Sequence, residues 1–505
     1  MKFELTHEGN ILSLVDATEL EIDQLNESLR KRIDNWRWDP RVKKGWWDGY
    51  ISYFKNDKYA PSGLWNEIVD IGKRFDMPVE IGGLENKFDK SISFDEFKKW
   101  SEKRFENSEK KPRDYQIETA WKIIKYKSCL AELATSAGKS LIMFMVFAYL
   151  LESEKSDKIL MIVPNVSLVV QASEDFYEYN SGYREMKLNI QQIFAGQKLR
   201  ENCNIVIGTY QSLVKKKKEY FDQFDTVCID ETHKAKSTSI KTILEKCKAP
   251  RKFGLSGTVP KEGTLDRLTL MAYTGPLITQ IKAKFLQDQG HITPCNVKIL
   301  EMNYASQEVR EAFKGLTHSE EDRKRLLNLE QNFVIEDKMR LEFITDAIKS
   351  TKKNCLVLFF RVDYGKEIHH NLRMKTDDRS VFYVDGGVSS DDRENYKSQM
   401  EEGEGKIMVA SYGTFSTGIN ITNLHTVFLT ESFKSDVIIR QSIGRGLRKH
   451  ATKDMLTIVD FVDDFRLEGF KNYLYKHSEK RREIYKEEEF PYKVKKVDLN
   501  KLYTR

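Results

Sequence analysis

Residues 128–140 read SCLAELATSAGKS, an apolar run followed by a loop of small residues that ends in Gly138-Lys139-Ser140. The next residues, LIMFMVFAYLL, are apolar and long enough to form a helix. A strand, a loop of small residues and a helix, in this order, predict a site where backbone N–H groups surround phosphate oxygens at the positive end of the helix. We therefore expect this segment to bind the phosphates of ATP.

The residue types in this loop suit separate tasks. Lys139 is long enough to reach the β and γ phosphates, and the hydroxyl of Ser140 is a ligand for Mg²⁺. The backbone of the preceding residues would surround the phosphates, namely Thr135, Ser136, Ala137 and Gly138. Leu133 stands where the usual pattern has its first glycine, so the loop alone is an incomplete match.

A pair of carboxylates further along the chain supplies the acidic partner that such a loop requires. Asp230 and Glu231 follow an apolar run and begin the sequence Asp-Glu-Thr-His. Asp230 is suited to hold magnesium through its water shell, and Glu231 to orient and deprotonate the attacking water. Adjacent carboxylates at a strand end are otherwise often a solvated loop, but the GKS segment in the same chain favours catalysis. His233 is better suited to couple the nucleotide state to neighbouring loops than to the chemistry itself.

Short apolar runs alternate with amphipathic helical stretches from about residue 113 onward, which is typical of a parallel sheet wound with helices. The first series of predicted strands covers residues 128–133, 158–163, 204–209, 226–230 and 252–256. A second series covers residues 355–360, 381–384, 406–410, 426–430 and 455–459. We expect an α/β protein with two tandem parallel-sheet domains.

The remaining segments set the predicted domain boundaries. Residues 95–112 are dense in charge and poor in aliphatic side chains, which indicates a helix running into a linker and separates a small front unit. One strand-like run followed by charged helical sequence indicates a connection with a helical elaboration. The predicted parts are a small α+β domain at 1–95, a charged linker at 96–112, the ATP-binding domain at 113–294, the connection at 295–350, the second parallel-sheet domain at 351–465 and a helical tail at 466–505.

Length and composition limit the class of protein. With 505 residues the chain is too long for one hydrophobic core, and a content of 40% hydrophobic and 32% charged residues fits a folded protein. A net charge of +6 permits a polyanionic partner without requiring one. The six cysteines are scattered singly, which gives no pattern for a disulfide framework or zinc ribbon. With no predicted signal peptide or membrane span, we expect a cytoplasmic protein without a membrane partner.

With the first two motifs placed, the chain resembles the superfamily 2 helicases of the DExH type, whose further motifs occur here in order. Residues 112–116, PRDYQ, are similar to the adenine-recognising segment, which implies nucleotide contacts from Arg113 and Gln116. Ser256 and Thr258 belong to a segment that resembles the coupling motif, with Gly257 where the family usually has alanine. Two strand-end loops resemble those that touch the nucleic-acid backbone, which implies contacts from Pro164, Asn165, Thr209 and Tyr210.

The later motifs of the family lie in the second predicted domain. Residues 411–420, SYGTFSTGIN, resemble a loop that contacts nucleotide and strand, which implies roles for Thr414 and Gly418. Residues 441–448, QSIGRGLR, resemble the motif QRxGRxxR, which implies catalytic roles for Gln441, Arg445 and Arg448. Guanidinium groups stay charged and fork onto the γ phosphate, so the two arginines are candidate arginine fingers, although in isolation they would indicate only a basic surface helix. Ser442 stands where the family usually has arginine. The motif order implies two RecA-like domains that bind ATP and Mg²⁺ between them.

The front unit contains an unusual mixture of basic and aromatic residues at 29–54, LRKRIDNWRWDPRVKKGWWDGYISYF. Basic groups offer phosphate contacts and indoles offer stacking surfaces. This pattern predicts a nucleic-acid-binding domain with contacts from Arg37, Arg41, Lys43 and Lys44. The alternative is that a domain of this size uses its large aromatics to build its core, and the sequence leaves both interpretations open.

With the front unit included, the arrangement is similar to recombination helicases of bacteriophages. This resemblance implies an ATP-dependent DNA helicase that unwinds and remodels forks, Holliday junctions, D-loops and R-loops in recombination, repair and replication. We expect a monomer that binds branched DNA, with RNA in R-loops and a small accessory protein as further candidate partners. The motifs are shared with enzymes that act on RNA or RNA–DNA hybrids and with motor subunits of nuclease complexes, which are the alternatives.

Overall fold

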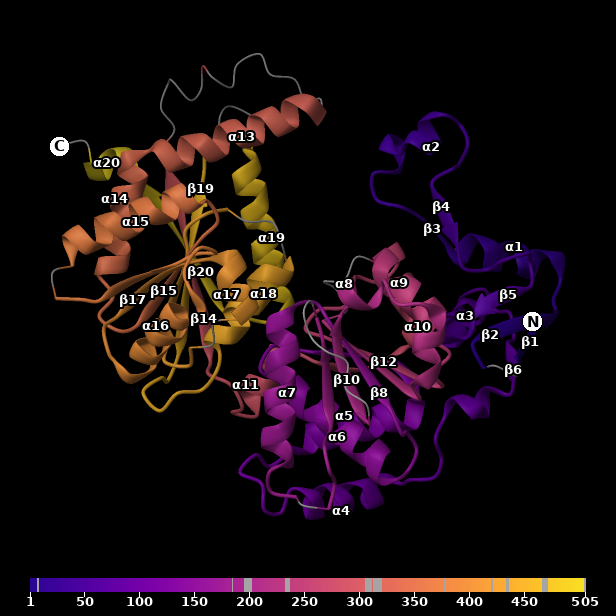
Figure 1. Cartoon of the computed structure of the whole chain (residues 1–505). Coiled ribbons are helices and arrows are strands. Elements are labelled where there is room, and N and C mark those ends of the chain that lie inside the picture. Colours follow the sequence, from indigo (N-terminus) through magenta and orange to yellow (C-terminus); the bar gives the residue numbers. More distant parts are fainter. Residues whose placement is uncertain are drawn as a thin grey trace. The chain divides into compact units, whose positions relative to one another are not determined.

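The computed structural model contains all 505 residues, and the structure describes them except for residues 7–8, 184, 195–201, 232–236, 305–310, 312–319, 377, 419–420, 433–435, 466–470 and 504–505. The chain divides into two compact units, Met1–Ile281 and Lys282–Arg505. Figure 1 shows the elements of each unit, coloured along the chain. His233 lies outside the described residues, so its coupling role stays a prediction.

The first unit begins with a mixed four-stranded sheet in the order β5-β2-β1-β6. Its elements are β1 (Lys2–Leu5), β2 (Ile11–Asp16), β5 (Tyr59–Pro61), β6 (Glu80–Gly82) and the helices α1 (Glu19–Ser28) and α3 (Trp65–Arg74). Its apolar core is continuous with Met271 of α10 (Leu265–Thr274), and the Tyr53 hydroxyl donates to Thr269 Oγ1 over 2.7 Å. The predicted small α+β domain therefore packs directly on the following domain.

A two-stranded hairpin leaves this sheet, formed by β3 (Arg30–Arg32) and β4 (Tyr50–Ser52). The short helices η1 (Trp36–Trp38) and α2 (Pro40–Lys43) lie between its strands. Figure 1 shows the hairpin extending past α1, with α2 at its far end. Every residue from 31 to 48 is exposed or half-buried, so the end of the hairpin has no apolar core of its own.

Within the described residues, the first parallel sheet has seven strands in the order β13-β7-β12-β11-β8-β10-β9. The strands are β7 (Ser128–Leu133), β8 (Ile159–Val163), β9 (Ile190–Ile193), β10 (Ile205–Thr209), β11 (Thr226–Asp230), β12 (Arg251–Ser256) and β13 (Leu277–Ile281). Helices around it include α5 (Asp114–Tyr126), α6 (Lys139–Glu152), α7 (Val166–Asn180) and α9 (Ser237–Lys246). Central strands of a parallel sheet are covered on both faces, which explains why near-continuous apolar runs identified them in the sequence. The predicted parallel-sheet domain is confirmed, and β9 and β13 add its two edges.

The segment predicted as a charged linker at 96–112 contains most of a packed helix. Helix α4 (Phe94–Arg104) ends in a buried arginine, and Arg104 Nε lies 2.9 Å from Glu152 Oε1 at the end of α6. Trp100 Nε1 donates to the other oxygen of the same carboxylate over 2.8 Å. The sequence predicted a helix running into a linker, and part of its charge fixes that helix against the first parallel-sheet domain.

The second unit contains another seven-stranded parallel sheet in its described part, in the order β16-β17-β15-β18-β19-β14-β20. Its strands are β14 (Cys295–Asn303), β15 (Cys355–Phe359), β16 (Val381–Val384), β17 (Ile407–Ser411), β18 (Thr426–Leu429), β19 (Leu456–Asp463) and β20 (Tyr492–Asp498). Its helices include α13 (Glu320–Glu336), α14 (Lys338–Lys349), α15 (Val362–Lys375), α16 (Ser390–Glu402), α17 (Tyr412–Gly418), α18 (Asp436–Gly446), α19 (Tyr473–Glu487) and α20 (Leu499–Tyr503). The prediction of two tandem parallel-sheet domains is confirmed.

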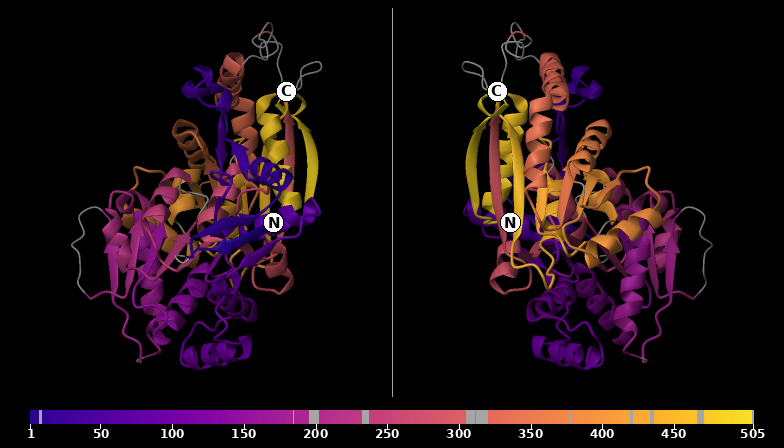
Figure 2. Two further views of the ribbon diagram at one scale, coloured as in Figure 1. Left: turned by 90° about the vertical axis from the view of Figure 1, so that its right-hand side faces the viewer. Right: turned by 90° about the vertical axis from the view of Figure 1, so that its left-hand side faces the viewer.

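Two strands of this sheet lie outside residues 351–465, one of them at the strand-like run predicted after residue 295. Strand β14 pairs in parallel with β19 on one side and β20 on the other, and Figure 2 shows it in salmon between two yellow strands. The segments 295–350 and 466–505 therefore each contribute one strand to the second parallel sheet. Strand β20, YKVKKVD, escaped prediction because only Val497 is buried and lysines occupy its edge, as is common where a sheet edge must stay unpaired.

Two expectations about the whole chain can be compared with the described residues. Among them, no helix is both long and apolar enough to span a membrane. All six cysteines are buried and free of disulfide bonds.

Candidate nucleotide site and nucleic-acid interface

The loop between β7 and α6 has a backbone shape that only particular residues adopt. Gly138 precedes the helix with a φ of 79°, and Ser136 has a φ of 73°. A Cβ atom at Gly138 would lie 2.2 Å from Nε2 of Gln116, so the position requires glycine for both its dihedral angle and its space. Lys139 and Ser140 then begin α6 with their backbone N–H groups at its positive end.

Two side chains of helix α5 form hydrogen bonds with this loop. Nε2 of Gln116 and the hydroxyl of Tyr115 both donate to the carbonyl oxygen of Ala137, each over 2.9 Å. Oε1 of Gln116 accepts from the backbone N–H of Arg113 over 2.9 Å, and the Gln116 side chain is buried. In this structure the Gln116 amide braces the loop, and its contact with an adenine base stays a prediction. Sequence reasoning missed Tyr115, although it lies inside the PRDYQ segment that carried the signal.

The acidic pair faces the loop from β11. Parallel strands end at the same edge of a sheet, so β7 and β11, separated by β12, bring the two motifs together. Lys139 Nζ lies 3.3 Å from Glu231 Oε1, and these side chains are only 15% and 13% exposed. Asp230 Oδ1 accepts from the backbone N–H of Glu231 over 2.9 Å, and Glu231 has a φ of 53°. A lysine and two adjacent carboxylates thus lie beside the loop that precedes α6.

The predicted coupling segment borders the same lysine at the end of β12. Ser256 Oγ donates to the carbonyl oxygen of Thr258 over 2.6 Å and accepts from the backbone N–H of Thr258 over 3.2 Å. A Cβ at Gly257 would lie 3.4 Å from Lys139 Nζ, so glycine leaves the lysine more room than the alanine usual in the family. The predicted coupling roles of Ser256 and Thr258 are not tested by this arrangement.

The predicted strand-contact residues lie along the same edge of the sheet. Asn165 follows β8 and accepts from the backbone N–H of Leu168 at the start of α7, over 3.0 Å. Thr209 ends the neighbouring strand β10, and its Oγ1 lies 3.0 Å from Ser212 Oγ. Gln211 Nε2 donates to the carbonyl oxygen of Pro164 over 3.3 Å, which links the two loops. Tyr210 stands between Thr209 and Gln211 in the sequence. Contacts from these residues to nucleic acid stay a prediction.

The remaining predicted residues lie in the second unit. Gln441 is buried within α18, Arg445 lies half-buried in its last turn, and Arg448 follows two residues after its end. Lys453 Nζ donates to the carbonyl oxygen of Gly446 over 2.9 Å, which fixes this end of the helix. Ser442, which stands where the family usually has arginine, is fully buried.

The loop after β17 has its own local order. Ser411 Oγ donates to Thr414 Oγ1 over 2.8 Å and accepts from the Thr414 backbone N–H over 3.2 Å. Gly418 is the last residue of α17. The predicted roles of Thr414 and Gly418 in contacting strand and nucleotide are not tested by this arrangement.

Comparison with known proteins shows which family has this combination of sheets and motifs. A family model described as "Type III restriction enzyme, res subunit" matches residues 109–261, and one described as "Helicase conserved C-terminal domain" matches residues 339–450. The ATP-dependent DNA helicase uvsW of Enterobacteria phage T4 is 32% identical over 508 residues, covering 96% of this chain and 97% of that protein. The chain belongs to the superfamily 2 helicases.

Solved structures agree with that assignment. The crystal structure of T4 UvsW matches 99% of this helicase and 100% of that chain, with a TM-score of 0.50 and 29% identity. The restriction-modification enzyme LlaBIII, solved bound to DNA, matches 86% of this helicase and 34% of that chain, with a TM-score of 0.57 and 14% identity. The second likeness concerns the fold alone. The resemblance to a phage recombination helicase expected from the motifs is thereby confirmed as a likeness to UvsW.

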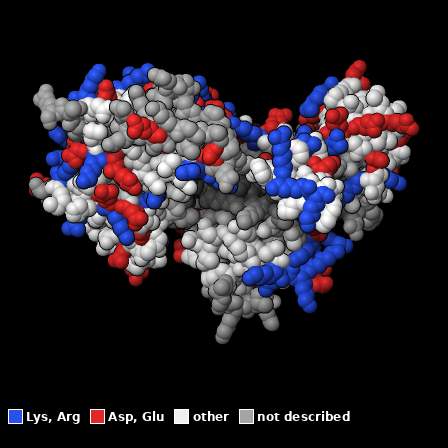
Figure 3. Space-filling view, turned by 90° about the horizontal axis from the view of Figure 1, so that it is seen from above, with Lys and Arg blue, Asp and Glu red and all other residues white. Residues whose placement is uncertain are grey.

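The hairpin of the helicase shows where its aromatic residues lie, while their contacts with nucleic acid stay a prediction. Its four tryptophans lie outside the apolar core of the front unit, and Trp46 and Trp38 are 75% and 55% exposed. The cations predicted to contact nucleic acid each lie over an indole ring: Arg37 over Trp36, Arg41 over Trp47, Lys43 over Trp38 and Lys44 over Trp46. Figure 3, which views the molecule from above, shows Lys and Arg side chains gathered over this part of it. The tryptophans are therefore surface residues and not core.

Two further features of the hairpin were not anticipated from the sequence. Arg32 in β3 lies over both Trp36, at 3.9 Å from the ring centre, and Tyr50, at 4.5 Å. A hydrogen bond from Arg41 to Asp39, the residue that caps α2, lowers the pKa of Asp39 to about 2. The basic residues at 30–32 could have indicated the contacts of Arg32 with the two rings. Arg32 and Arg41 therefore each contact a ring of the hairpin, and Arg41 also contacts a carboxylate of the same hairpin.

Proposed function

We propose that this ATP-dependent helicase hydrolyses ATP with Mg²⁺ at the loop between β7 and α6 and uses the energy to unwind and remodel branched DNA. The observation that carries the proposal is the meeting of Lys139 and Glu231, 3.3 Å apart, at the carboxyl edge of the first parallel sheet. In this proposal, the lysine turns from Glu231 to the β and γ phosphates. Glu231 is then released to orient and deprotonate the attacking water.

The oxygen ligands near the loop suit magnesium. The Ser140 hydroxyl and the Asp230 carboxylate are hard oxygen donors, and Mg²⁺ usually completes its shell with water and phosphate oxygens. The metal would neutralise the charge of the phosphates when bound.

Arg445 and Arg448 are proposed to complete the site from the second unit. Guanidinium groups keep their charge and can stabilise the charge that develops on the γ phosphate. Both residues are half-buried. Loss of the γ phosphate would remove the attraction between the arginines and the loop, and repeated cycles of this kind would move the helicase along a strand.

Support for DNA as the substrate comes from the similarity to the T4 protein, which is named a DNA helicase and covers 96% of this chain. Support for a branched substrate comes from the hairpin. Exposed indoles offer stacking surfaces to bases unpaired at a branch point, and the cations beside them offer phosphate contacts. We propose that the helicase acts as a monomer, with RNA in R-loops and a small accessory protein as further partners.

The ATPase proposal is tested by Lys139→Ala in the full-length protein. We expect hydrolysis with and without DNA to fall by about 100-fold or more, because the contact with the transferred phosphate is lost. Lys103→Ala, which removes an exposed lysine from α4, is the matched control and should keep full activity. Unchanged hydrolysis in the Lys139 variant would show that the site is wrongly assigned.

The substrate proposal is tested by unwinding assays on a set of forks, four-way junctions, RNA–DNA hybrids, structured RNA and plain duplex. Trp46→Ala and Trp38→Ala should weaken fork binding by about 1–3 kcal/mol each if the rings stack on bases. They should leave DNA-independent ATP hydrolysis unchanged. Phe75→Ala, an exposed aromatic outside the hairpin, is the matched control. A preference for structured RNA would overturn the assignment of DNA as the substrate. Equal fork affinity in all variants would overturn the assignment of the hairpin as a DNA-binding surface.

A further inference from the structure

A cavity of about 350 Å³ lies between the small front sheet and the first parallel-sheet domain, on the side where β7 and β12 begin. Residues around β2 and β5 form one wall, and α9, α10 and the start of β12 form the other. The phosphate loop follows the far end of β7. A six-residue strand spans on the order of 20 Å, so the cavity lies at the opposite edge of the sheet from Lys139.

The charge around this cavity is strongly unbalanced. Six lysines line it, namely Lys55, Lys87, Lys218, Lys241, Lys248 and Lys252, against one lining carboxylate, Glu245. That carboxylate is already engaged, because the Tyr273 hydroxyl donates to it over 2.8 Å and Lys241 lies 3.8 Å away. The cavity therefore presents a surplus of positive charge to whatever enters it.

Two of these lysines are withdrawn from solvent. Lys252 is only 8% exposed, and its one described hydrogen bond outside the strand ladders runs from its backbone N–H to the carbonyl oxygen of Lys127, so no described residue engages its Nζ. Lys87 is half-buried, and its Nζ donates to the carbonyl oxygen of Gly9 over 2.5 Å. Burial, together with repulsion from Lys252 and Lys127, lowers the pKa of Lys87 to about 8, and burial lowers the pKa of Lys252. Lysines are rarely buried without an anionic partner, so this pair is costly unless an anion joins it.

We propose that this cavity binds a phosphate-bearing anion, held by Lys87 and Lys252, at a site separate from the ATP loop. Several converging ammonium groups suit a phosphoryl group, which carries more charge and more acceptor oxygens than a carboxylate. The volume suits a small ligand such as pyrophosphate or a nucleotide, or the phosphorylated end of a strand, and is too small for a duplex. The apolar and aromatic side chains of Ile11 and Tyr59 on the same wall are 43% and 40% exposed, which offers a surface for a sugar or base.

The test measures pyrophosphate binding by calorimetry in full-length protein carrying Lys139→Ala, so that the ATP loop contributes little. In this background we expect saturable binding that Lys252→Met and Lys87→Met each weaken by roughly tenfold or more, since each removes one charge-assisted contact. Lys103→Met is the matched control and should bind as the background does. Lys252→Arg keeps the charge and should retain binding.

Two additional measurements make the outcome decisive. Lys252→Met should raise the melting temperature of the unliganded protein, because it removes a buried charge, while abolishing the further rise produced by pyrophosphate. Binding of single strands with a 5′-phosphate or a 5′-hydroxyl identifies the source of the phosphoryl group. A preference for the 5′-phosphate that depends on Lys252 indicates a strand end. Binding of pyrophosphate but of neither strand indicates a free anion. Pyrophosphate and phosphorylated strands that bind equally well with and without Lys87 and Lys252 would overturn the proposal, as would no binding at all.

Discussion

The two parallel sheets of this helicase have similar architecture but use charged residues in different ways. In the first sheet, Lys139 and Glu231 meet in the loops beyond the strand ends, where both remain partly exposed. In the second sheet, Arg340 and Arg481 pair with Asp463 and Asp460 inside the domain, and all four side chains are at most 1% exposed. Charges at the edge remain available to a ligand, whereas charges in the interior are available only to each other.

The buried pairs of the second sheet join helices to one strand. Arg340 in α14 donates from Nε to Asp463 Oδ1 over 2.6 Å and from Nη2 to the carbonyl oxygen of Thr430 over 2.7 Å. The hydroxyl of Tyr304 donates to the same carboxylate oxygen over 2.7 Å. A second set joins α19 to β19, where Arg481 lies 2.8 Å from Asp460. Their geometry satisfies the buried groups, which is the condition under which such pairs are tolerated.

The largest expected effect separates chemistry from stability in the first sheet. Glu231→Gln should lower ATP turnover on the order of 10²–10⁴-fold, because an amide cannot accept the proton of the attacking water. The melting temperature should change little, since the side chain lies at the edge of the sheet. Both quantities are measured on the same preparation, with the exposed Glu262→Gln as control. Strong destabilisation with normal turnover would mean that this charge is structural, like those of the second sheet.

The second prediction applies the same separation to the second sheet. Asp463→Asn should lower the free energy of unfolding by about 3–5 kcal/mol, because it leaves Arg340 charged and buried. The double variant Arg340→Met/Asp463→Leu should lose less than the single one, since it removes both charges together. Denaturant unfolding measures both variants. The control is Asp498→Asn, whose exposed partner Lys501 lies 3.7 Å away and whose ion pair should contribute about 0–1 kcal/mol.

If the double variant proved less stable than Asp463→Asn, the buried pair would be a net source of stability. The difference between the two sheets would then be one of degree, because both would use charges for a favourable interaction.

The same contrast explains how much could be predicted from the sequence. The strands β7, β11 and β16 have the predicted bounds, because the sequence of a buried parallel strand is a continuous apolar run that ends at a turn. Lys139 and Glu231 could be named because nucleotide chemistry requires these residue types at fixed places after strands. The tryptophans of the hairpin could be named as candidates, but only the fold showed that they lie outside the core.

Other features could not be predicted, for physical reasons. Arg340 and Asp463 lie 123 residues apart, and no local spacing marks a pair that forms only when α14 docks on β19. Strand β20 looks like a charged tail because an edge strand needs few buried side chains. The cavity lysines come from separate segments, so their convergence depends on how the front sheet docks.

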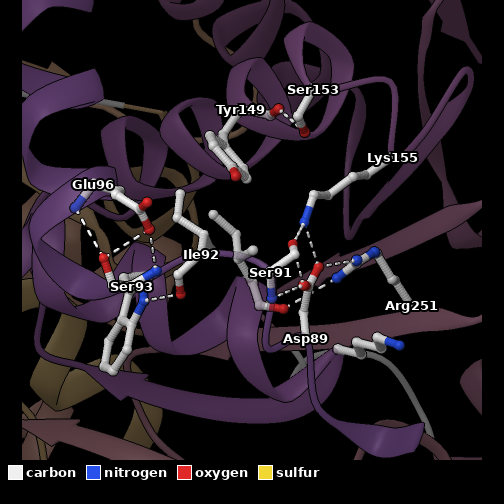
Figure 4. A network of polar contacts seen from close by, with 12 residues as sticks. Asp89, Ser91, Ile92, Ser93, Glu96, Tyr149, Ser153, Lys155 and Arg251 are labelled. Atoms are coloured by element: carbon white, nitrogen blue, oxygen red, sulfur yellow. Dashed lines mark hydrogen bonds and ion pairs between the residues drawn. The ribbon is translucent and has the colours of Figure 1, made fainter.

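The smallest expected effect concerns an ion cluster that departs from the contrast, because it lies inside the first unit. Asp89 Oδ2 lies 2.7 Å from both Lys155 Nζ and Arg251 Nη2, and its Oδ1 accepts from Ser91, as Figure 4 shows. Burial alone would raise the pKa of Asp89, but hydrogen bonds from Lys155, Ser91 and Arg251 outweigh it and hold the pKa well below its ordinary value of 3.8.

A carboxyl with a lowered pKa contributes stability above its ordinary pKa and loses it as the pH falls further. Asp89→Asn should therefore cost about 1–3 kcal/mol at pH 7 and reduce the acid-induced loss of stability below about pH 4. Denaturant unfolding at pH 7 and pH 3 measures both effects, and Asp95→Asn, at an exposed position of α4, is the control. If the loss of stability between pH 7 and pH 3 were the same in Asp89→Asn as in the unmodified protein, Lys155 and Arg251 would have found other partners. The first sheet would then keep its important charges at its carboxyl edge alone, and the contrast with the second sheet would be complete.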